Sequence, residues 1–160
     1  METSGQTEHQ ESAGGAKTYS GSCHCGAVQF RVTADLGKGG GRCNCSICTK
    51  VGQTGGIVKP EAFELLSSEE SLSSYEWASR TSQRYFCKRC GVHCFARGHL
   101  AVLGGDYVSV NFNSLDDIDP RETLVVHWDG RHDNWQAGPR STPWPISPPA
   151  HREQREIVDA

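Results

Sequence analysis

The sequence predicts an all-β domain, and three observations support this fold class. Short runs that alternate apolar and polar residues, as half-buried strands do, recur between residues 27 and 129. Pro60 and several glycines separate these runs, and the two segments that favour a helix are both short. The eight cysteines fall in closely spaced groups at the ends of the runs, where metal-binding turns occur.

The expected strands follow one another at short intervals. The first strand alternates apolar and polar residues, and two later strands flank Cys90 and Gly91, which predicts a hairpin whose turn carries metal ligands. Val108 and Val110 lie on one face of the seventh strand. In chain order, we expect strands at residues 27–32, 55–59, 62–67, 71–78, 82–87, 92–97, 106–113 and 123–129.

Two short helical segments are expected between these strands. One is residues 46–52, directly after a group of three cysteines. The other is a helical turn that Ser114 caps and Pro120 ends. No internal repeat is long enough to indicate a solenoid.

The composition divides the chain into three parts. Residues 1–16 are polar, with almost no large apolar side chain, and are expected to be disordered. Residues 17–137 form the predicted domain, whose thin core a metal would help to stabilise. Residues 138–160 contain five of the seven prolines and predict an extended tail over the surface with a frayed end.

Charge and hydropathy exclude several classes of protein. The net charge is −3 without a basic stripe, which argues against a nucleic-acid partner. No apolar run is long enough to span a membrane, and the N-terminus lacks the apolar core of a signal peptide, so we expect a cytoplasmic protein without a membrane partner. Cysteines in such a protein favour metal thiolates, with disulfides and buried free thiols as alternatives.

Two cysteine pairs can supply four ligands to one zinc ion. Each pair is followed by a glycine, which lets the backbone turn so that amide groups face the sulfurs. Four thiolates complete a tetrahedral site, and a closed site of this kind is structural. The predicted ligands of this structural zinc are Cys23, Cys25, Cys87 and Cys90.

A cysteine triplet can supply three ligands to a second zinc ion. Cys43, Cys45 and Cys48 leave one position open, which predicts a catalytic zinc. Three glycines before the triplet suggest an exposed, bendable approach for substrate. Three thiolates weaken Lewis acidity and favour sulfur as an incoming ligand. The alternative is an inert site closed by a histidine or by Cys94, although Cys94 is expected to be a core thiol.

Several polar residues near these groups each have two interpretations. Arg42 and Lys50 flank the triplet and either bind substrate carboxylates or are solvated charges. The loop with His127, His132 and Asp133 either supplies a general acid or base or is a surface turn closed by its tryptophans Trp128 and Trp135, and we favour the turn. For the remaining polar residues we predict only a location. His24 is expected to face solvent, and either His93 or Cys94 is expected in the core. Asn111 and Asn113 are expected either near the second zinc or as caps of the next turn.

The segments GSCHCGAVQF, CNCSICTK, YFCKRCG, VNFNSLDD and HWDGRHDNW resemble the zinc-dependent family that contains glutathione-dependent formaldehyde-activating enzyme and centromere protein V. The resemblance covers about residues 17–135 in family order. It implies a β-tent fold of antiparallel sheets with two zinc ions. By position, Cys23, Cys25, Cys87 and Cys90 match the structural site, and Cys43, Cys45 and Cys48 match the catalytic site.

The function that the resemblance implies is that of a carbon–sulfur lyase. The named reaction of the family joins formaldehyde to glutathione and gives S-hydroxymethylglutathione. We therefore expect a small-molecule substrate, with glutathione as first candidate, whose thiolate attacks an aldehyde carbonyl at the open zinc. Two alternatives are a non-catalytic zinc scaffold that binds a protein or chromatin, and a lyase or isomerase of a specialised pathway that uses the same zinc.

Overall fold

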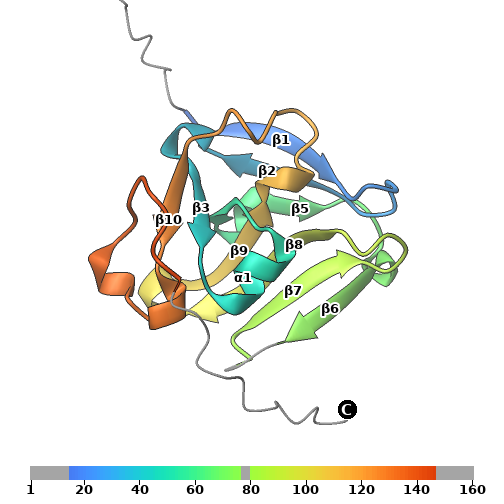
Figure 1. Cartoon of the computed structure of the whole chain (residues 1–160). Coiled ribbons are helices and arrows are strands. Elements are labelled where there is room, and N and C mark those ends of the chain that lie inside the picture. The colour runs from blue at the N-terminus through green and yellow to red at the C-terminus, as the bar shows by residue number, and fades with distance from the viewer. Residues whose placement is uncertain (1–14, 77–79, 147–160) are drawn as a thin grey trace, which may run out of the picture.

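The computed structural model describes residues 15–76 and 80–146. Two β-sheets pack face to face, and helical segments are short, so the predicted all-β class is confirmed. The smaller sheet lies at the top right of Figure 1 and has the strand order β1-β2-β5. Its strands are β1 (Lys17–Ser22), β2 (Gln29–Ala34) and β5 (Phe63–Leu65).

The larger sheet has seven strands and carries most of the residues discussed below. Its neighbours pair antiparallel, as predicted, except that β10 and β3 run parallel. That parallel pair places Trp128 opposite Cys43 and so brings the end of the domain beside the cysteine triplet. Across the sheet, the strands are β10 (Val125–Trp128), β3 (Gly40–Cys43), β4 (Gly55–Val58), β9 (Gly105–Asn111), β8 (His93–Leu100), β7 (Ser82–Cys87) and β6 (Leu72–Glu76).

One α-helix, α1 (Ser46–Val51), confirms the helix expected after the triplet. The prediction of a helical turn after Ser114 is wrong, because the helical turn forms earlier in the chain, at Phe112–Ser114. Asn111 caps it by accepting a hydrogen bond from the Asn113 amide at 3.2 Å, while buried Ser114 donates back to the Asn111 carbonyl at 2.7 Å. The other 3-10 turns are Leu36–Lys38, Pro60–Ala62, Glu69–Ser71, Ala101–Leu103, Gly130–His132 and Trp135–Ala137.

The core lies between the two sheets and is centred on aromatic rings. Phe95 of β8 contacts Phe63 of β5 at a centroid distance of 4.6 Å and Phe30 of β2 at 6.1 Å. Val108 and Val110 are buried on the same side, as the alternation in their strand predicted. The opposite face of the large sheet carries α1, as Figure 1 shows, and it is the face on which the polar residues of the second cysteine group gather.

Strands β1 and β3 were not expected from the sequence. The segment of β1 is polar and glycine-containing, and β3 is a four-residue strand that begins with two glycines. The glycines before the triplet were expected to form an exposed, bendable approach, and this expectation is wrong. Gly40 is buried in β3, where an added Cβ would lie 2.9 Å from Thr54 and 3.1 Å from Phe112. These glycines permit close packing instead.

Two of the sequence expectations fall largely outside the described residues. They are the disordered segment 1–16, of which 15 and 16 are described, and the tail 138–160, of which 138–146 are described. The described start of the tail runs back along β10, where Arg140 pairs with His127 and the Trp144 indole donates to the His127 carbonyl at 3.0 Å. Among the described helices, none has the length and apolar character needed to cross a membrane.

Candidate metal centres

The first cysteine cluster joins the two sheets. Cys23 and Cys25 lie in the turn between β1 and β2 of the small sheet. Cys87 ends β7 of the large sheet, and Cys90 lies in the turn that leads to β8. Although Cys25 and Cys87 are 62 positions apart, their sulfurs are 3.6 Å apart. All four sulfurs lie within 4.8 Å of one another and could hold a metal ion.

The backbone around the first cluster is shaped to face the sulfurs. The amide of Val28 donates to Cys23 Sγ, and the amide of Arg89 donates to Cys87 Sγ, both at 3.3 Å. Gly26 and Gly91, which follow the two pairs, have φ angles of 77° and 73°, in the left-handed region that glycine adopts without strain. Cys23 and Cys87 are fully buried, Cys90 is half-buried and Cys25 is exposed, so this cluster reaches from the core to the surface.

The second cluster comes from a single short segment. Cys43 ends β3, Cys45 is the N-cap residue of α1, and Cys48 lies in the first turn of that helix. The chain reverses from strand to helix within these residues, which brings the three sulfurs within 4.8 Å of one another. All three cysteines are half-buried, and the second cluster could also hold a metal ion.

The thiols of the second cluster strongly influence one another. Hydrogen bonds from the thiols of Cys43 and Cys48 hold the pKa of Cys45 well below its usual value. The same contacts raise the pKa of Cys48. Cys45 is therefore the thiol of the three that loses its proton most readily, and a thiolate is the form of cysteine that binds a metal.

A polar chain of side chains supports the second cluster from the large sheet. Arg84 of β7 donates to Cys48 Sγ at 3.3 Å through one guanidinium nitrogen and to Gln53 Oε1 at 2.7 Å through another. Gln53 in turn donates to Ser109 of β9 at 2.8 Å. These bonds fix the guanidinium against the sulfur, where its positive charge offsets the charge of the thiolates. No local sequence signal points to Arg84, because its partner is 36 positions away.

The loop after β10 covers the other side of the second cluster. Gly130 approaches Cys43 so closely that an added Cβ would lie 2.4 Å from its sulfur. Asn44, between two of the cysteines, donates to Asp129 Oδ1 at 2.7 Å and accepts from the Arg131 amide at 2.8 Å. The expected packing of Trp128 and Trp135 is present, with centroids 6.3 Å apart. This turn is therefore both closed by tryptophans and attached to the cluster.

Asp129 is the centre of this loop. Its side chain is 6% exposed, and the same oxygen that accepts from Asn44 also lies 2.7 Å from His132 Nδ1. Burial by itself raises the pKa of this carboxyl, but hydrogen bonds from three neighbouring side chains outweigh burial and leave the pKa below its usual value. Asp129 is therefore a charged acceptor that holds the His132 ring.

His93 is buried beside Arg84 without a partner for its ring. Neither ring nitrogen has a hydrogen-bond partner in the part of the chain that is described, although its backbone carbonyl accepts from Asn111 at 2.9 Å. Burial, together with the Arg84 charge, lowers the pKa of His93 to about 4. The ring is therefore neutral at pH 7. Cys94, next in the chain, is also buried and lies outside both clusters.

The remaining predicted residues occupy varied positions. His24 is exposed, as expected. Arg42 is exposed and donates to Thr54 at 2.7 Å, and Lys50 is exposed in the last turn of α1. The Asn113 side chain donates to the Gly52 carbonyl at 2.8 Å and so holds the end of α1.

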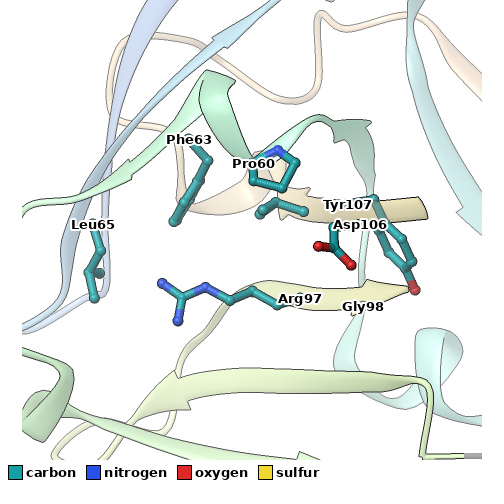
Figure 2. A pocket seen from close by; sticks show the side chains of 8 residues that line it. Pro60, Phe63, Leu65, Arg97, Gly98, Asp106 and Tyr107 are labelled. Atoms are coloured by element: carbon teal, nitrogen blue, oxygen red, sulfur yellow. The ribbon is translucent and has the colours of Figure 1, made fainter. Parts of the chain in front are cut away.

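A hollow of about 390 Å³ on another part of the surface lies away from both clusters. Figure 2 shows Arg97 and Asp106 pointing into it, between Phe63, Leu65 and Tyr107. Both charges are already engaged, since Arg97 pairs with Glu69 at 2.9 Å and Asp106 pairs with His99 at 2.6 Å. No cysteine lines this hollow, so it does not provide the chemistry of the clusters.

Known proteins are similar to parts of this chain. One named "Putative glutathione-dependent formaldehyde-activating enzyme", from Halomonas elongata, is 40% identical over 44% of this chain and 50% of its own length. A protein of the same name from Emericella nidulans is 30% identical over 62% of this chain and 52% of its own. This chain thus spans about half the length of these curated relatives.

A solved structure and a family profile extend the match. The crystal structure of a Rhodobacter sphaeroides protein is similar with a TM-score of 0.57 and 28% identity, over 64% of this chain and 93% of that one. The profile of the family described as glutathione-dependent formaldehyde-activating enzyme matches residues 18–128, which include all seven clustered cysteines. The chain belongs to this family.

Proposed function

We propose that this protein is a zinc-dependent enzyme of the carbon–sulfur lyase type that joins a thiol to a small aldehyde. Glutathione and formaldehyde are the first candidate substrates, and S-hydroxymethylglutathione is the corresponding product. The observation that carries the proposal is the half-exposed cluster of three cysteines, which offers one ligand fewer than the four that zinc takes. The names of the relatives support the same substrates, and a cytoplasmic location remains part of the proposal.

The sulfur geometry fits zinc. In a tetrahedral site with zinc–sulfur distances of about 2.3 Å, neighbouring sulfurs are about 3.8 Å apart. The sulfur pairs Cys23–Cys25 and Cys25–Cys87 are both 3.6 Å apart, close to that value and far longer than a disulfide bond of about 2.05 Å. Ligand sets of thiol sulfur alone favour zinc over magnesium or calcium. We therefore assign a structural zinc to Cys23, Cys25, Cys87 and Cys90.

The second cluster is the proposed catalytic site. A zinc ion held by Cys43, Cys45 and Cys48 supplies a position for a substrate sulfur and lowers the pKa of that thiol. Arg84 holds the Cys48 sulfur from the sheet side and limits the build-up of negative charge when a fourth sulfur arrives. Lys50, exposed in the last turn of α1, is the proposed partner of the carboxylates of glutathione, whereas Arg42 pairs with His127 one position before Cys43, on the other face of the sheet.

Metal content and thiol binding test the proposal. The purified protein should contain two zinc ions per chain, and cobalt substitution should make both clusters visible through thiolate-to-cobalt charge-transfer bands. Glutathione, or another thiol from a panel with cysteine and an alkyl thiol, should strengthen these bands by adding a sulfur ligand. Adduct formation with formaldehyde should then exceed the uncatalysed rate.

Two variants separate the possible outcomes. Cys45→Ser should abolish the spectral response to thiols, whereas Cys94→Ala, which changes a buried thiol outside both clusters, should keep it. If no thiol perturbs the wild-type spectrum and Cys94→Ala does, Cys94 closes the second site and the protein is a scaffold. If thiols bind but no aldehyde adduct forms faster than in buffer, the substrate assignment is wrong.

A further inference from the structure

The loop that covers the second cluster carries a histidine–carboxylate pair. His132 and Asp129 are joined through Nδ1 and Oδ1 at 2.7 Å, and Asp129 is simultaneously bonded to Asn44, which lies between two cysteines of the cluster. Gly130, between the two members of the pair, lies against the sulfur of Cys43. The pair is thus attached to the cluster at two independent points.

The geometry of the pair determines which ring nitrogen is available. Asp129 is a buried, charged acceptor, so His132 donates its Nδ1 proton to it, and the ring orientation is fixed. The His132 side chain is 43% exposed, which leaves Nε2 for solvent or substrate. A buried carboxylate that orients an accessible imidazole in this way is the arrangement used for general acid–base catalysis.

The other basic groups near the cluster are less suited to move a proton. Arg84 contacts Cys48, but a guanidinium donates hydrogen bonds and has no acceptor site for a proton. His93 has both ring nitrogens buried away from solvent. His127 pairs with Arg42 in the ladder between β10 and β3, one position before Cys43, so its side chain points to the opposite face of the sheet from that of Trp128.

We propose that His132 is the general acid and base of the thiol–aldehyde reaction at the second cluster and that Asp129 is its positioning residue, an inference that rests on the proposed function. The substrate thiol gives its proton to His132 Nε2. The sulfur electron pair then forms the bond to the aldehyde carbon, and the π pair of the carbonyl moves to its oxygen. The proton returns from Nε2 to that oxygen, giving S–CH2–OH. Nothing is oxidised or reduced, and the reverse reaction uses the same steps.

The environment of His132 is mixed in charge. The charged residues of the same loop are Asp129, Arg131 and Asp133, whose carboxylate accepts from the Trp135 indole at 2.6 Å. From the turn between β3 and α1, the neutral side chain of Asn44 donates to Asp129 and accepts from the Arg131 amide.

The chain provides a matched control for this pair. His99 and Asp106 form a similar contact, Nδ1 to Oδ1 at 2.6 Å, across β8 and β9 on the exposed surface. His99→Gln removes an imidazole with the same kind of partner, and neither residue contacts a cysteine cluster. The variants to compare are therefore His132→Gln, Asp129→Asn and His99→Gln, all in the zinc-loaded full chain.

Adduct formation and thiol binding are measured separately. His132→Gln should lower the rate of glutathione–formaldehyde exchange, followed by NMR exchange spectroscopy, by roughly 10²–10⁴-fold. Its zinc content and the response of its cobalt spectrum to glutathione should match the wild type. Added imidazole should restore part of the rate, and His99→Gln should behave as wild type. In the wild type, glutathione should shift the ring resonances of His132 and not those of His99.

The outcomes distinguish this inference from the proposed function. A wild-type rate in His132→Gln, or loss of zinc or of glutathione binding in that variant, would overturn the role of His132 while the proposed function still holds. No adduct formation by the wild type with any thiol of the panel would instead overturn the proposed function itself. Asp129→Asn should lower the rate less than His132→Gln, and a larger effect would contradict a positioning role.

Discussion

The two cysteine clusters contain the same ligand type at similar spacings but differ in what they connect. The first brings together turns from two sheets, with Cys25 and Cys87 separated by 62 positions. The second lies within six consecutive residues, from Cys43 to Cys48. A metal in the first cluster closes a long loop, and its binding free energy becomes folding free energy, whereas a metal in the second constrains a segment that is already local. The separation of ligands along the chain therefore indicates which site supports the fold.

The clusters also differ in what surrounds their sulfurs. Backbone amides face sulfurs of both clusters, those of Val28 and Arg89 in the first and that of Cys45 in the second, and the first cluster combines two fully buried cysteines with exposed Cys25. The second cluster is half-exposed and is contacted by a side-chain guanidinium, that of Arg84, and by the loop at Gly130. Backbone amides stabilise the negative charge of the sulfurs. Side chains and a solvent-exposed surface can also contact a substrate. This difference leads to four tests.

The largest effect is expected when one ligand of each cluster is removed. Cys87→Ser should cost about 4 kcal/mol or more of unfolding free energy, a part of the roughly 10–16 kcal/mol that zinc supplies to small metal-dependent domains. Cys45→Ser should cost about 1 kcal/mol and lose one zinc ion. Urea unfolding and elemental analysis of both variants measure this. Equal losses of stability would refute the division into structural and catalytic sites.

Replacement of Arg84 should affect one cluster and not the other. Arg84→Met removes the donor to Cys48 and should weaken zinc binding at the second cluster by about 10–100-fold, a typical effect of losing a partner of a metal ligand. Arg97→Met is the matched control, because Arg97 lies on the neighbouring strand and contacts Glu69, Tyr85 and Phe95 instead. Competition with a chelator measures the zinc affinity of each site. Equal weakening of both sites in Arg84→Met would show that the arginine acts through the whole fold.

The comparison also shows how far sequence reasoning reaches. The spacings of Cys23, Cys25, Cys87 and Cys90 were enough to group four sulfurs, because short turns force neighbouring thiols to one point and the glycines after them permit the turn. The expected strand at 82–87 matches β7, and the helix expected after the triplet is α1, since both predictions rest on short, local stretches of sequence.

The features that the sequence could not predict depend on pairing between strands that are far apart in the chain. β3 is too short and glycine-rich to be predicted as a strand, and its parallel pairing with β10 brings the loop at Asp129 to the cysteines. Arg84 reaches the second cluster through the register of the sheet. The one available signal was Asn44, a polar side chain enclosed between two ligands, whose partners 85 and 87 positions away could not be named.

The pH dependence of the unfolding free energy should show that His93, which lies beside Arg84, is buried as a neutral ring. Its folded pKa of about 4 is below the unfolded value of 6.5, so the unfolded chain binds more protons between these values and stability is lost as the pH falls from 6.5 towards 4. The loss reaches about 2 kcal/mol at pH 5, by linkage at about 1.36 kcal/mol per unit of pKa. His93→Leu should lack this loss, so its urea stability relative to wild type should rise by that amount from pH 7 to pH 5. Parallel pH profiles would contradict the burial of a neutral ring.

The smallest effects are expected at two glycines, one beside each cluster, which are required for different reasons. Gly26 has open space around it but a φ of 77°, so Gly26→Ala introduces backbone strain of about 1–2 kcal/mol. Gly130→Ala would place its Cβ 2.4 Å from Cys43 Sγ and 2.7 Å from the Trp135 ring, and the half-exposed loop can relieve this contact by moving away. We expect a similar or smaller stability loss, about 1 kcal/mol, in Gly130→Ala.

The functional readouts of these two variants should differ although their stabilities are similar. Gly26→Ala should leave the thiol response of the cobalt spectrum and the adduct rate unchanged, because its strain stays in the turn of the first cluster. Gly130→Ala should lower the adduct rate, because moving the loop takes His132 away from Cys43 while the three sulfurs stay in place. A wild-type rate in Gly130→Ala would show that the loop only covers the cluster. A lowered rate in Gly26→Ala would show that the two clusters are coupled through the sheets.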